Sequence, residues 1–290
     1  MSHNENSPTP SEHGWNIVKW AWDNRDEIKK RLNELRLWLF PNKDDPKKRS
    51  GILILGAGGV GKTTLGRILS GDFDMLADPL TEYKESRNVE KLTLSGEGKE
   101  DVEIVVLPGQ ENRRSTWGEL LKDISSGYYR GIVLVSAFGY HSLAQISYKQ
   151  HRLYEPGAKP GKFLEAFSAE RRSEELKVLR NILPHIKTTP TKLWMMSVIT
   201  KQDLWWENKD VVKHYQHSEY QEKIEEIQAH CGLEKFRHEY IYCSLIINRL
   251  MTDKGELMKN NKAGYDHGLY MQSLRRLFET IDSMREWEEG

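Results

Sequence analysis

A short glycine-rich segment at positions 56–63 has the residue types and the spacing needed to hold phosphate groups. Its sequence, GAGGVGKT, fits the pattern G-x-x-x-x-G-K-[ST]. Glycines allow several backbone N–H groups to converge on phosphate oxygens without clashes from side chains. Lys62 would reach the terminal phosphates, and the hydroxyl of Thr63 would bind Mg²⁺. The predicted contacts in this segment are Gly56, Gly58, Gly59, Val60, Gly61, Lys62, Thr63 and Thr64.

The flanking sequence favours a phosphate-binding loop over an exposed glycine-rich turn. Positions 51–55, GILIL, form an apolar run typical of a buried strand, and positions 63–69 continue as a helix. A strand, a glycine loop and a helix in this order direct the positive end of the helix at bound phosphates. We therefore expect the ligand to be a nucleoside triphosphate.

Apolar runs and helical patterns alternate along the rest of the chain. Two apolar stretches around the turn-forming SGEG at 95–98 predict a hairpin. The alternation predicts an α/β fold with a doubly wound, mostly parallel six-stranded sheet and one antiparallel edge strand. The predicted strands are 51–55, 89–94, 102–107, 131–136, 193–200 and 240–243, and the predicted helices are 63–69, 111–127, 173–186, 211–231 and 269–288.

Composition divides the chain into three parts. Residues 1–14 are polar and rich in Ser, Pro and Asn, which predicts a disordered tail. Residues 15–50 combine an amphipathic helix over 15–40 with a charged linker that contains two prolines. Residues 51–290 form the nucleotide-binding domain, in which a polar stretch at about 140–172 is predicted to be an insertion and a surface for a partner.

Charge and cysteine content exclude several classes of function. Lys and Arg number 43 and Asp and Glu also number 43, so no global charge attracts nucleic acid, and no nucleic-acid partner is expected. No window approaches the ~20 apolar residues that a membrane span needs. Cys231 and Cys243 are too few for a disulfide framework, which predicts a cytoplasmic protein. His141, His151 and His185 match no metal-ligand spacing.

The phosphate loop resembles that of the Ras and Arf small GTPases, because GAGGVGK occurs in this form in Ras. At the end of a predicted strand, TKQD at 200–203 resembles the N/T-K-x-D motif of the same family. The resemblance implies that Thr200, Lys201 and Asp203 bind the base, with Asp203 accepting hydrogen bonds from the N1–H and 2-amino groups of guanine. Taken alone, Asp203 could equally be the N-cap of a helix.

Two further segments resemble parts of the same family. Ser244 and Leu245, in the sequence CSL, stand where the family has its second base-contact loop, although a polar strand end would look similar. LPGQE at 107–111 resembles the start of switch II, so that Gly109 would contact the γ-phosphate and Gln110 would orient the attacking water. Val106 replaces the aspartate that holds Mg²⁺ through water in this family, which predicts weaker Mg²⁺ binding and slower hydrolysis.

Thr81 follows Thr63 at the spacing that Ras has between its loop threonine and its switch I threonine. It would then be a second Mg²⁺ ligand beside Thr63 and a sensor of the γ-phosphate, although Ser86 or Thr93 could take this role. The resemblance makes Lys62, Thr81 and Gln110 the predicted catalytic residues.

The predicted function is a GTP-binding molecular switch that hydrolyses GTP slowly. Its switch loops would adopt different conformations with GTP and with GDP, and each conformation would bind a different protein effector or regulator. Two alternatives remain at this stage. Val106 is compatible with a guanine-nucleotide-binding scaffold that hydrolyses negligibly, and a P-loop ATPase or kinase is left if TKQD is coincidental.

The predicted helix at 15–40 carries tryptophans beside basic residues, which suits a membrane surface, as in the N-terminal helix of Arf-like proteins. Its acidic residues interrupt the basic face and favour packing on the domain or on a partner. These acidic residues are Asp23, Asp26, Glu27 and Glu34. A location at the periphery of a membrane is the alternative.

Overall fold

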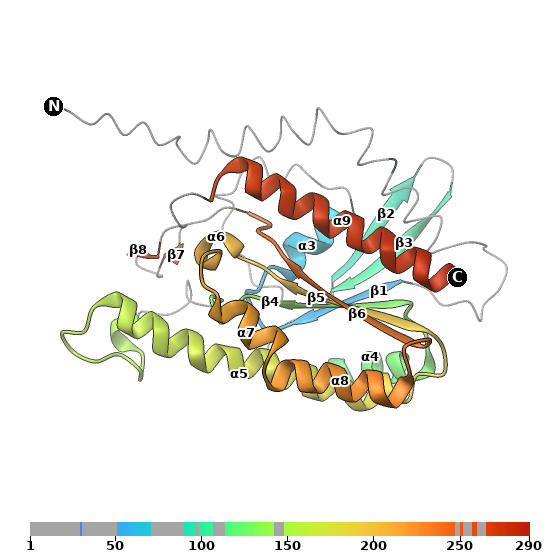
Figure 1. Cartoon of the computed structure of the whole chain (residues 1–290), viewed down its shortest axis with the longest axis horizontal. Coiled ribbons are helices and arrows are strands. Elements are labelled where there is room, and N and C mark those ends of the chain that lie inside the picture. Colours follow the sequence, from blue (N-terminus) through green and yellow to red (C-terminus); the bar gives the residue numbers. More distant parts are fainter. Residues whose placement is uncertain are drawn as a thin grey trace.

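A computed structural model describes residues 30, 51–70, 90–96, 99–106, 114–141, 148–246, 250–251, 257–259 and 265–290 (Figure 1). The predicted tail, the linker and the predicted helix at 15–40 apart from Lys30 therefore lie outside the described residues. Among the helices that are described, none is both long and apolar enough to cross a membrane.

A six-stranded sheet forms the centre of the molecule, in the order β2-β3-β1-β4-β5-β6. Strands β3, β1, β4, β5 and β6 run parallel to one another, and β2 pairs with β3 in the antiparallel direction at one edge. This sheet confirms the predicted fold class, including the hairpin and the antiparallel edge strand. The strands are β1 (Ile52–Gly56), β2 (Glu90–Gly96), β3 (Lys99–Val106), β4 (Gly131–Ser136), β5 (Leu193–Ile199) and β6 (Phe236–Tyr242).

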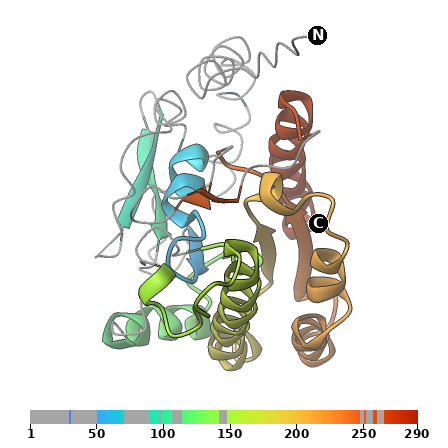
Figure 2. The same cartoon turned by 90° about the vertical axis from the view of Figure 1, so that its left-hand side faces the viewer.

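Helices cover both faces of the sheet (Figures 1 and 2). On one face, α3 (Lys62–Leu69) and α9 (His267–Glu289) pack over side chains of β1, β4 and β5. On the other face lie four helices, which Figure 2 shows next to one another with α4 in green, α5 in yellow-green and α7 and α8 in orange. These four are α4 (Arg114–Ser126), α5 (Pro160–Lys187), α7 (Asp210–Gln216) and α8 (Glu219–Cys231). Burial on both faces explains why the central strands are largely apolar, since all residues of β1, β4 and β5 are buried and the only hydroxyl side chains among them are those of Ser136 and Ser197.

The long helix α5 differs from the prediction at its N-terminal end. It begins at Pro160 rather than near residue 173, and a short 3-10 turn, Tyr148–Gln150, precedes it. Proline suits the first turn of a helix because its missing N–H has no partner there in any case. Phe163 and Phe167 then bury this first part of α5 in the core. The part of the predicted insertion from Pro160 onward is therefore regular helix.

Three smaller differences concern the C-terminal half of the chain. The predicted helix at 211–231 is divided into α7 and α8, because Ser218 leaves the helical conformation and caps α8 by accepting a hydrogen bond from Tyr220 N. Strand β6 begins at Phe236, earlier than predicted. A short helix, α6 (Gln202–Trp205), and a two-stranded sheet of β7 (Leu250–Met251) and β8 (Leu257–Lys259) were not predicted.

Candidate functional site

The C-terminal ends of four parallel strands bring the sequence motifs together. The last residues of β4, β5 and β6 are in register, since Ser136 pairs with Ile199 and Ile199 pairs with Tyr242, and Gly56 at the end of β1 pairs with Val135. The segments that follow these strands therefore start side by side. This edge of a parallel sheet is where such folds bind ligands.

The phosphate loop follows β1 and ends where α3 begins. Gly56 has a φ of 147°, and a Cβ there would lie 2.2 Å from the carbonyl oxygen of Val135. Gly61, the N-cap of α3, has a φ of 100°. Both positions therefore need glycine, one for close approach and one for the left-handed backbone. The first turn of α3 contains no acidic residue, so its positive end faces the loop without a competing carboxylate.

Lys62 lies across the phosphate loop. Its side chain is buried, and Nζ donates a hydrogen bond to the carbonyl oxygen of Ala57 at 2.7 Å. The ammonium group is thus held by the loop itself, close to where the loop N–H groups would meet an anion. Thr63, the predicted Mg²⁺ ligand, follows directly and is partly buried.

Thr200 joins the predicted base motif to the phosphate loop. Its buried hydroxyl lies 2.6 Å from the carbonyl oxygen of Val60 and 3.0 Å from that of Ser136. The Trp205 indole N–H donates to the Thr200 carbonyl at 2.8 Å, so the residue is fixed from both sides. Movement of either motif must therefore disturb the other.

Asp203 is held by the second predicted base-contact loop. Ser244 Oγ donates to Asp203 Oδ1 at 2.8 Å and accepts from Asp203 N at 2.9 Å. Both residues are buried, with exposed fractions of 1% and 0%. Asp203 lies in the first turn of α6, where a carboxylate is ordinary, but its hydrogen bond reaches a loop distant in sequence rather than only its own helix.

Leu245 closes the contact between these segments. It is buried in the same apolar cluster as Val60, and a Cβ on Gly61 would lie 3.2 Å from its Cδ1. The structure thus brings the segments 56–63, 200–203 and 243–245 into one site. These segments contain every predicted nucleotide-binding residue except Thr64, which follows in α3, and Gly109.

Lys201 has an unusual backbone and environment. Its φ of 58° is left-handed, and Nζ donates a hydrogen bond to the carbonyl oxygen of Tyr140, just beyond β4. Burial lowers the pKa of Lys201 to about 8, against the opposing effect of the carboxylates of Asp203 and Glu175. Tyr140 and Glu175 were not predicted to belong to the site, because neither stands in a recognisable motif.

The predicted switch residues cannot be placed in the same way. Thr81, Gly109 and Gln110 lie outside the described residues. Val106 is described: it ends β3 opposite Ile54, is 1% exposed and belongs to an apolar cluster with Val60 and Leu65. Mg²⁺ prefers oxygen ligands, so Thr63 fits such an ion while Val106 offers it none. Within the described part of the chain, no group of three or more His, Cys, Asp or Glu residues could hold a metal.

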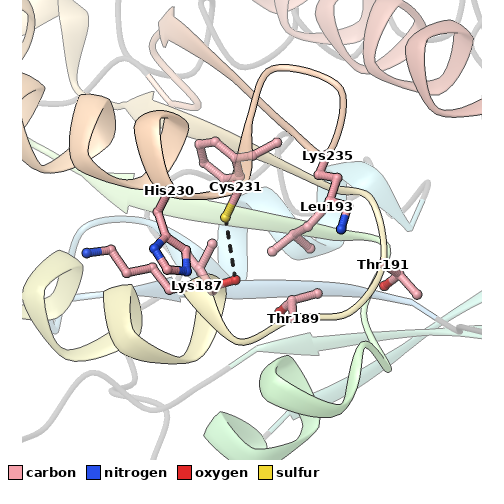
Figure 3. A pocket seen from close by; sticks show the side chains of 9 residues that line it. Lys187, Thr189, Thr191, Leu193, His230, Cys231 and Lys235 are labelled. Atoms are coloured by element: carbon pink, nitrogen blue, oxygen red, sulfur yellow. Dashed lines mark hydrogen bonds between the residues drawn. The ribbon is translucent and has the colours of Figure 1, made fainter.

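A cavity of about 160 Å³ lies elsewhere in the molecule, between α5, α8 and the first residues of β5 and β6 (Figure 3). Leu193 and Phe236 begin their strands there, at the end of the sheet opposite to the phosphate loop. Cys231 lies in this cavity with Sγ 4.0 Å from the Ile186 carbonyl oxygen, and burial raises the pKa of its thiol. The cavity contains none of the motif residues.

No protein-family model matches the chain, and no curated protein matches its sequence. Among solved structures, the mammalian SRP receptor is 16% identical with a TM-score of 0.41, and the match covers 80% of this chain and 99% of that one. The bacterial selenocysteine-specific elongation factor EF-Sec is 17% identical with a TM-score of 0.35, and the match covers 80% of this chain and 29% of the factor.

An ADP-ribosylation-factor-like small COPII coat GTPase of Encephalitozoon cuniculi in complex with GDP is 13% identical, with a TM-score of 0.36 and coverage of 94% and 96%. The assignment of the fold itself comes from the chain's own topology. The strand order, the antiparallel edge strand and the phosphate loop between β1 and α3 agree with the P-loop GTPase fold expected from the sequence.

Proposed function

We propose that this chain binds GTP and GDP at the C-terminal edge of its sheet and acts as a molecular switch with slow GTP hydrolysis. One observation carries the proposal: the Thr200 hydroxyl bonds the Val60 carbonyl of the phosphate loop. A phosphate loop alone serves many nucleotides, whereas a motif of base-binding type that is bonded to that loop supports a guanine nucleotide. The Ser244 hydroxyl on Asp203 adds to this support, because it orients the carboxylate.

Different residues of the site would bind the phosphates and the base of the nucleotide. The N–H groups of the loop and of the first turn of α3 would bind the phosphates, and Lys62 would leave the Ala57 carbonyl for the terminal phosphate oxygens. Asp203 would accept from the N1–H and 2-amino groups of guanine. Adenine lacks this pair of donors, so the site would discriminate against ATP.

Hydrolysis would depend on residues outside the described ranges. Gln110 would orient the attacking water, and Thr81 and Gly109 would respond to the γ-phosphate. Thr63 would hold Mg²⁺, which when bound would neutralise charge on the phosphate oxygens. Intrinsic turnover in such proteins is on the order of 10⁻⁴ per second, and Val106 should make it slower.

The burial of Val106 favours a second candidate function, a guanine-nucleotide-binding scaffold that hydrolyses negligibly. The side chain lies in the apolar cluster and provides no oxygen where the family resemblance expects a carboxylate. In this case the protein would signal by the presence of nucleotide rather than by its cleavage. In both cases the readout would be a change of protein effector or regulator, in the cytoplasm.

The deciding experiment is to denature the purified full-length protein and identify the released nucleotide. We expect GTP or GDP. Binding of GTP, xanthosine triphosphate and ATP should then be titrated for the wild type and Asp203→Asn, with the exposed Asp210→Asn as the matched control. Asp203→Asn should weaken GTP about 100-fold and favour xanthosine triphosphate, because the amide NH₂ would face the 2-amino donor of guanine but could donate to the 2-carbonyl oxygen of xanthine.

The outcomes separate the candidates. Equal affinity of the wild type for GTP and ATP would remove the guanine assignment and favour an ATPase or kinase. Bound GTP that stays intact over a day would favour the scaffold over the switch. Unchanged preferences in Asp203→Asn would show that Asp203 is only a helix cap.

Flotation of the full chain with liposomes, with and without residues 1–50, tests the alternative of a peripheral membrane location.

A further inference from the structure

Glu175 is a carboxylate buried beneath the loop that follows β4. It lies in the middle of α5, and its side chain is fully buried. Oε1 accepts hydrogen bonds from Ala137 N at 2.8 Å and from Gly139 N at 3.1 Å. Taking a carboxylate out of water is strongly unfavourable, and this cost is offset only when such partners are in place. This carboxylate therefore fixes the conformation of the loop at 137–141.

Tyr215 of α7 fixes the same loop from a second side. Its hydroxyl donates to Glu175 Oε2 at 2.6 Å and accepts from Phe138 N at 3.0 Å. Three successive loop N–H groups thus end on two side chains. Phe138 and Gly139 both have left-handed backbones, with φ of 50° and 76°, and this conformation turns successive N–H groups inward.

The loop also packs closely against α5, and its last residue, His141, lies beside two carboxylates of that helix. A Cβ on Gly139 would lie 2.1 Å from the carbonyl oxygen of Ser168, so this position has no room for a side chain. His141, fully buried, places Nδ1 3.3 Å from Glu175 Oε1 and Nε2 3.7 Å from Glu174 Oε2. The conformation of the loop is thus specified by buried polar groups as well as by packing.

The loop in turn holds a residue of the base motif. The Tyr140 carbonyl, between Gly139 and His141, accepts the hydrogen bond from Lys201 Nζ. The carboxylate of Glu175 also favours the charged form of Lys201. A continuous chain of contacts therefore runs from Glu175 and Tyr215 through the loop to Lys201, next to Asp203.

We propose that Glu175 and Tyr215 are positioning residues for guanine-nucleotide binding, which act by holding the 137–141 loop so that the Tyr140 carbonyl fixes Lys201 beside the base. The inference rests on the proposed function. It assigns to α5 and α7 a role at the base end of the site, although neither helix carries a nucleotide-binding motif. Packing alone needs no carboxylate here, since an apolar side chain would fill the same space.

A double-mutant cycle on GDP affinity tests the inference with full-length protein. Glu175→Gln and Tyr215→Phe should each weaken GDP about tenfold, and so should Lys201→Met. Because the first two act through Lys201, each should cost less than about twofold when Lys201→Met is already present. The matched control is Tyr220→Phe. It removes a different buried hydrogen bond, the one between the Tyr220 and Ser197 hydroxyls, on the same face of the sheet. Its effect on GDP affinity should be small and unchanged by Lys201→Met.

Each result has a distinct meaning. Losses from Glu175→Gln and Tyr215→Phe that add fully to that of Lys201→Met would overturn the inference and leave the proposed function intact. A wild type that binds no guanine nucleotide would overturn the proposed function and the inference with it. Thermal melting of every variant shows which are folded, and Tyr215→Phe, which keeps the ring, decides the test if Glu175→Gln unfolds.

Discussion

The hydroxyl of Thr200 donates to the carbonyl oxygen of Val60 at 2.6 Å, across 140 residues of sequence. Val60 belongs to the phosphate loop, and Thr200 opens the motif that is predicted to read the base. The same hydroxyl lies 3.0 Å from the Ser136 carbonyl at the end of β4. One buried side chain therefore connects the phosphate loop after β1, the end of β4 and the motif after β5, and its removal should affect both stability and ligand binding.

Thr200→Val tests this connection with a side chain of the same shape. The Val60 carbonyl would lose this buried partner, whereas the Ser136 carbonyl still accepts from Thr200 N. We expect the free energy of unfolding in urea to fall by about 1–3 kcal/mol. We also expect GDP affinity to fall about tenfold because the loop is no longer tied to the base motif.

The control for this variant is Thr188→Val, in which an exposed hydroxyl that also bonds a backbone carbonyl is removed. Its effect should stay within about 0.5 kcal/mol. Equal effects of the two substitutions on GDP affinity would contradict the role given to Thr200.

Gly61→Ala tests the conformation of the phosphate loop. The φ of 100° disfavours any side chain, and the added Cβ would lie 3.2 Å from Leu245 Cδ1. Gly157→Ala is a close control, because Gly157 has a φ of 81° but open space around its Cβ. Both should cost about 1 kcal/mol of stability, and Gly61→Ala should in addition weaken GDP at least tenfold. Similar affinity in the two variants would show that the loop adapts.

The affinity for GDP should depend on pH through Lys201. Burial lowers the pKa of its ammonium group to about 8 without nucleotide. An anionic ligand nearby should raise that pKa, so the complex binds more protons than the empty protein above pH 8. Affinity should therefore decline as pH rises from 8 to 9, by at most about fivefold. Isothermal titration measures this dependence. Lys201→Met, which lacks the ammonium group, should show a flatter dependence of GDP affinity on pH, and its curve corrects for ionisation of the nucleotide itself.

Glu175 should make stability depend on acid. Burial by itself raises the pKa of this carboxyl, but the His141 ring, the Tyr215 hydroxyl and the Ala137 N–H lower it by more, so the net pKa lies below 4.5. The folded protein then binds fewer protons than the unfolded chain. The stabilisation by Glu175 is present above pH 4.5 and is lost as pH falls through its lower, folded pKa.

The difference in unfolding free energy between the wild type and Glu175→Gln should accordingly shrink below pH 4.5. It should be about 2 kcal/mol near pH 7. Glu207→Gln, at an exposed position, should show no such dependence. A constant difference between wild type and Glu175→Gln across this range would mean that the carboxylate is not the group that stabilises the loop.

The sheet could be predicted from the sequence because its central strands are buried on both faces. Continuous apolar runs such as GIVLVS in β4 leave no other interpretation at that length. Strand β6 was predicted too short for the opposite reason. Arg237, His238 and Glu239 lie at the edge of the sheet and are only partly buried, so the first half of the strand looks polar.

The site could be predicted as far as its motifs extend. The glycine loop and TKQD are local patterns, and the sheet places them together at its C-terminal edge. The pair Glu175 and Tyr215, which holds the 137–141 loop, has no local sequence pattern. Glu175 is one of several glutamates in α5, and Tyr215 lies on a different helix. Only the packing of α5 and α7 on the sheet brings these two side chains to the 137–141 loop, whose Tyr140 carbonyl accepts from Lys201.

Val106→Asp tests whether the missing carboxylate explains slow turnover. The position is 1% exposed and surrounded by apolar side chains, including Ile54 and Leu65. A buried carboxylate without a partner should lower the free energy of unfolding by about 3 kcal/mol or more in the absence of ligand. If the nucleotide and Mg²⁺ lie at this edge of the sheet, adding GDP and Mg²⁺ should restore part of that loss, and GTP hydrolysis should become faster and more dependent on Mg²⁺.

The neutral variant Val106→Asn separates charge from shape. It places a polar group of the same size in the same apolar cluster, so it should also be destabilised, but Mg²⁺ should not rescue it to the same extent. Thermal melting with GDP, with and without Mg²⁺, and single-turnover GTP hydrolysis measure the two effects. Should Val106→Asp and Val106→Asn respond alike to Mg²⁺, or hydrolysis fail to rise in Val106→Asp, position 106 does not limit turnover, and the scaffold function would need a different physical basis.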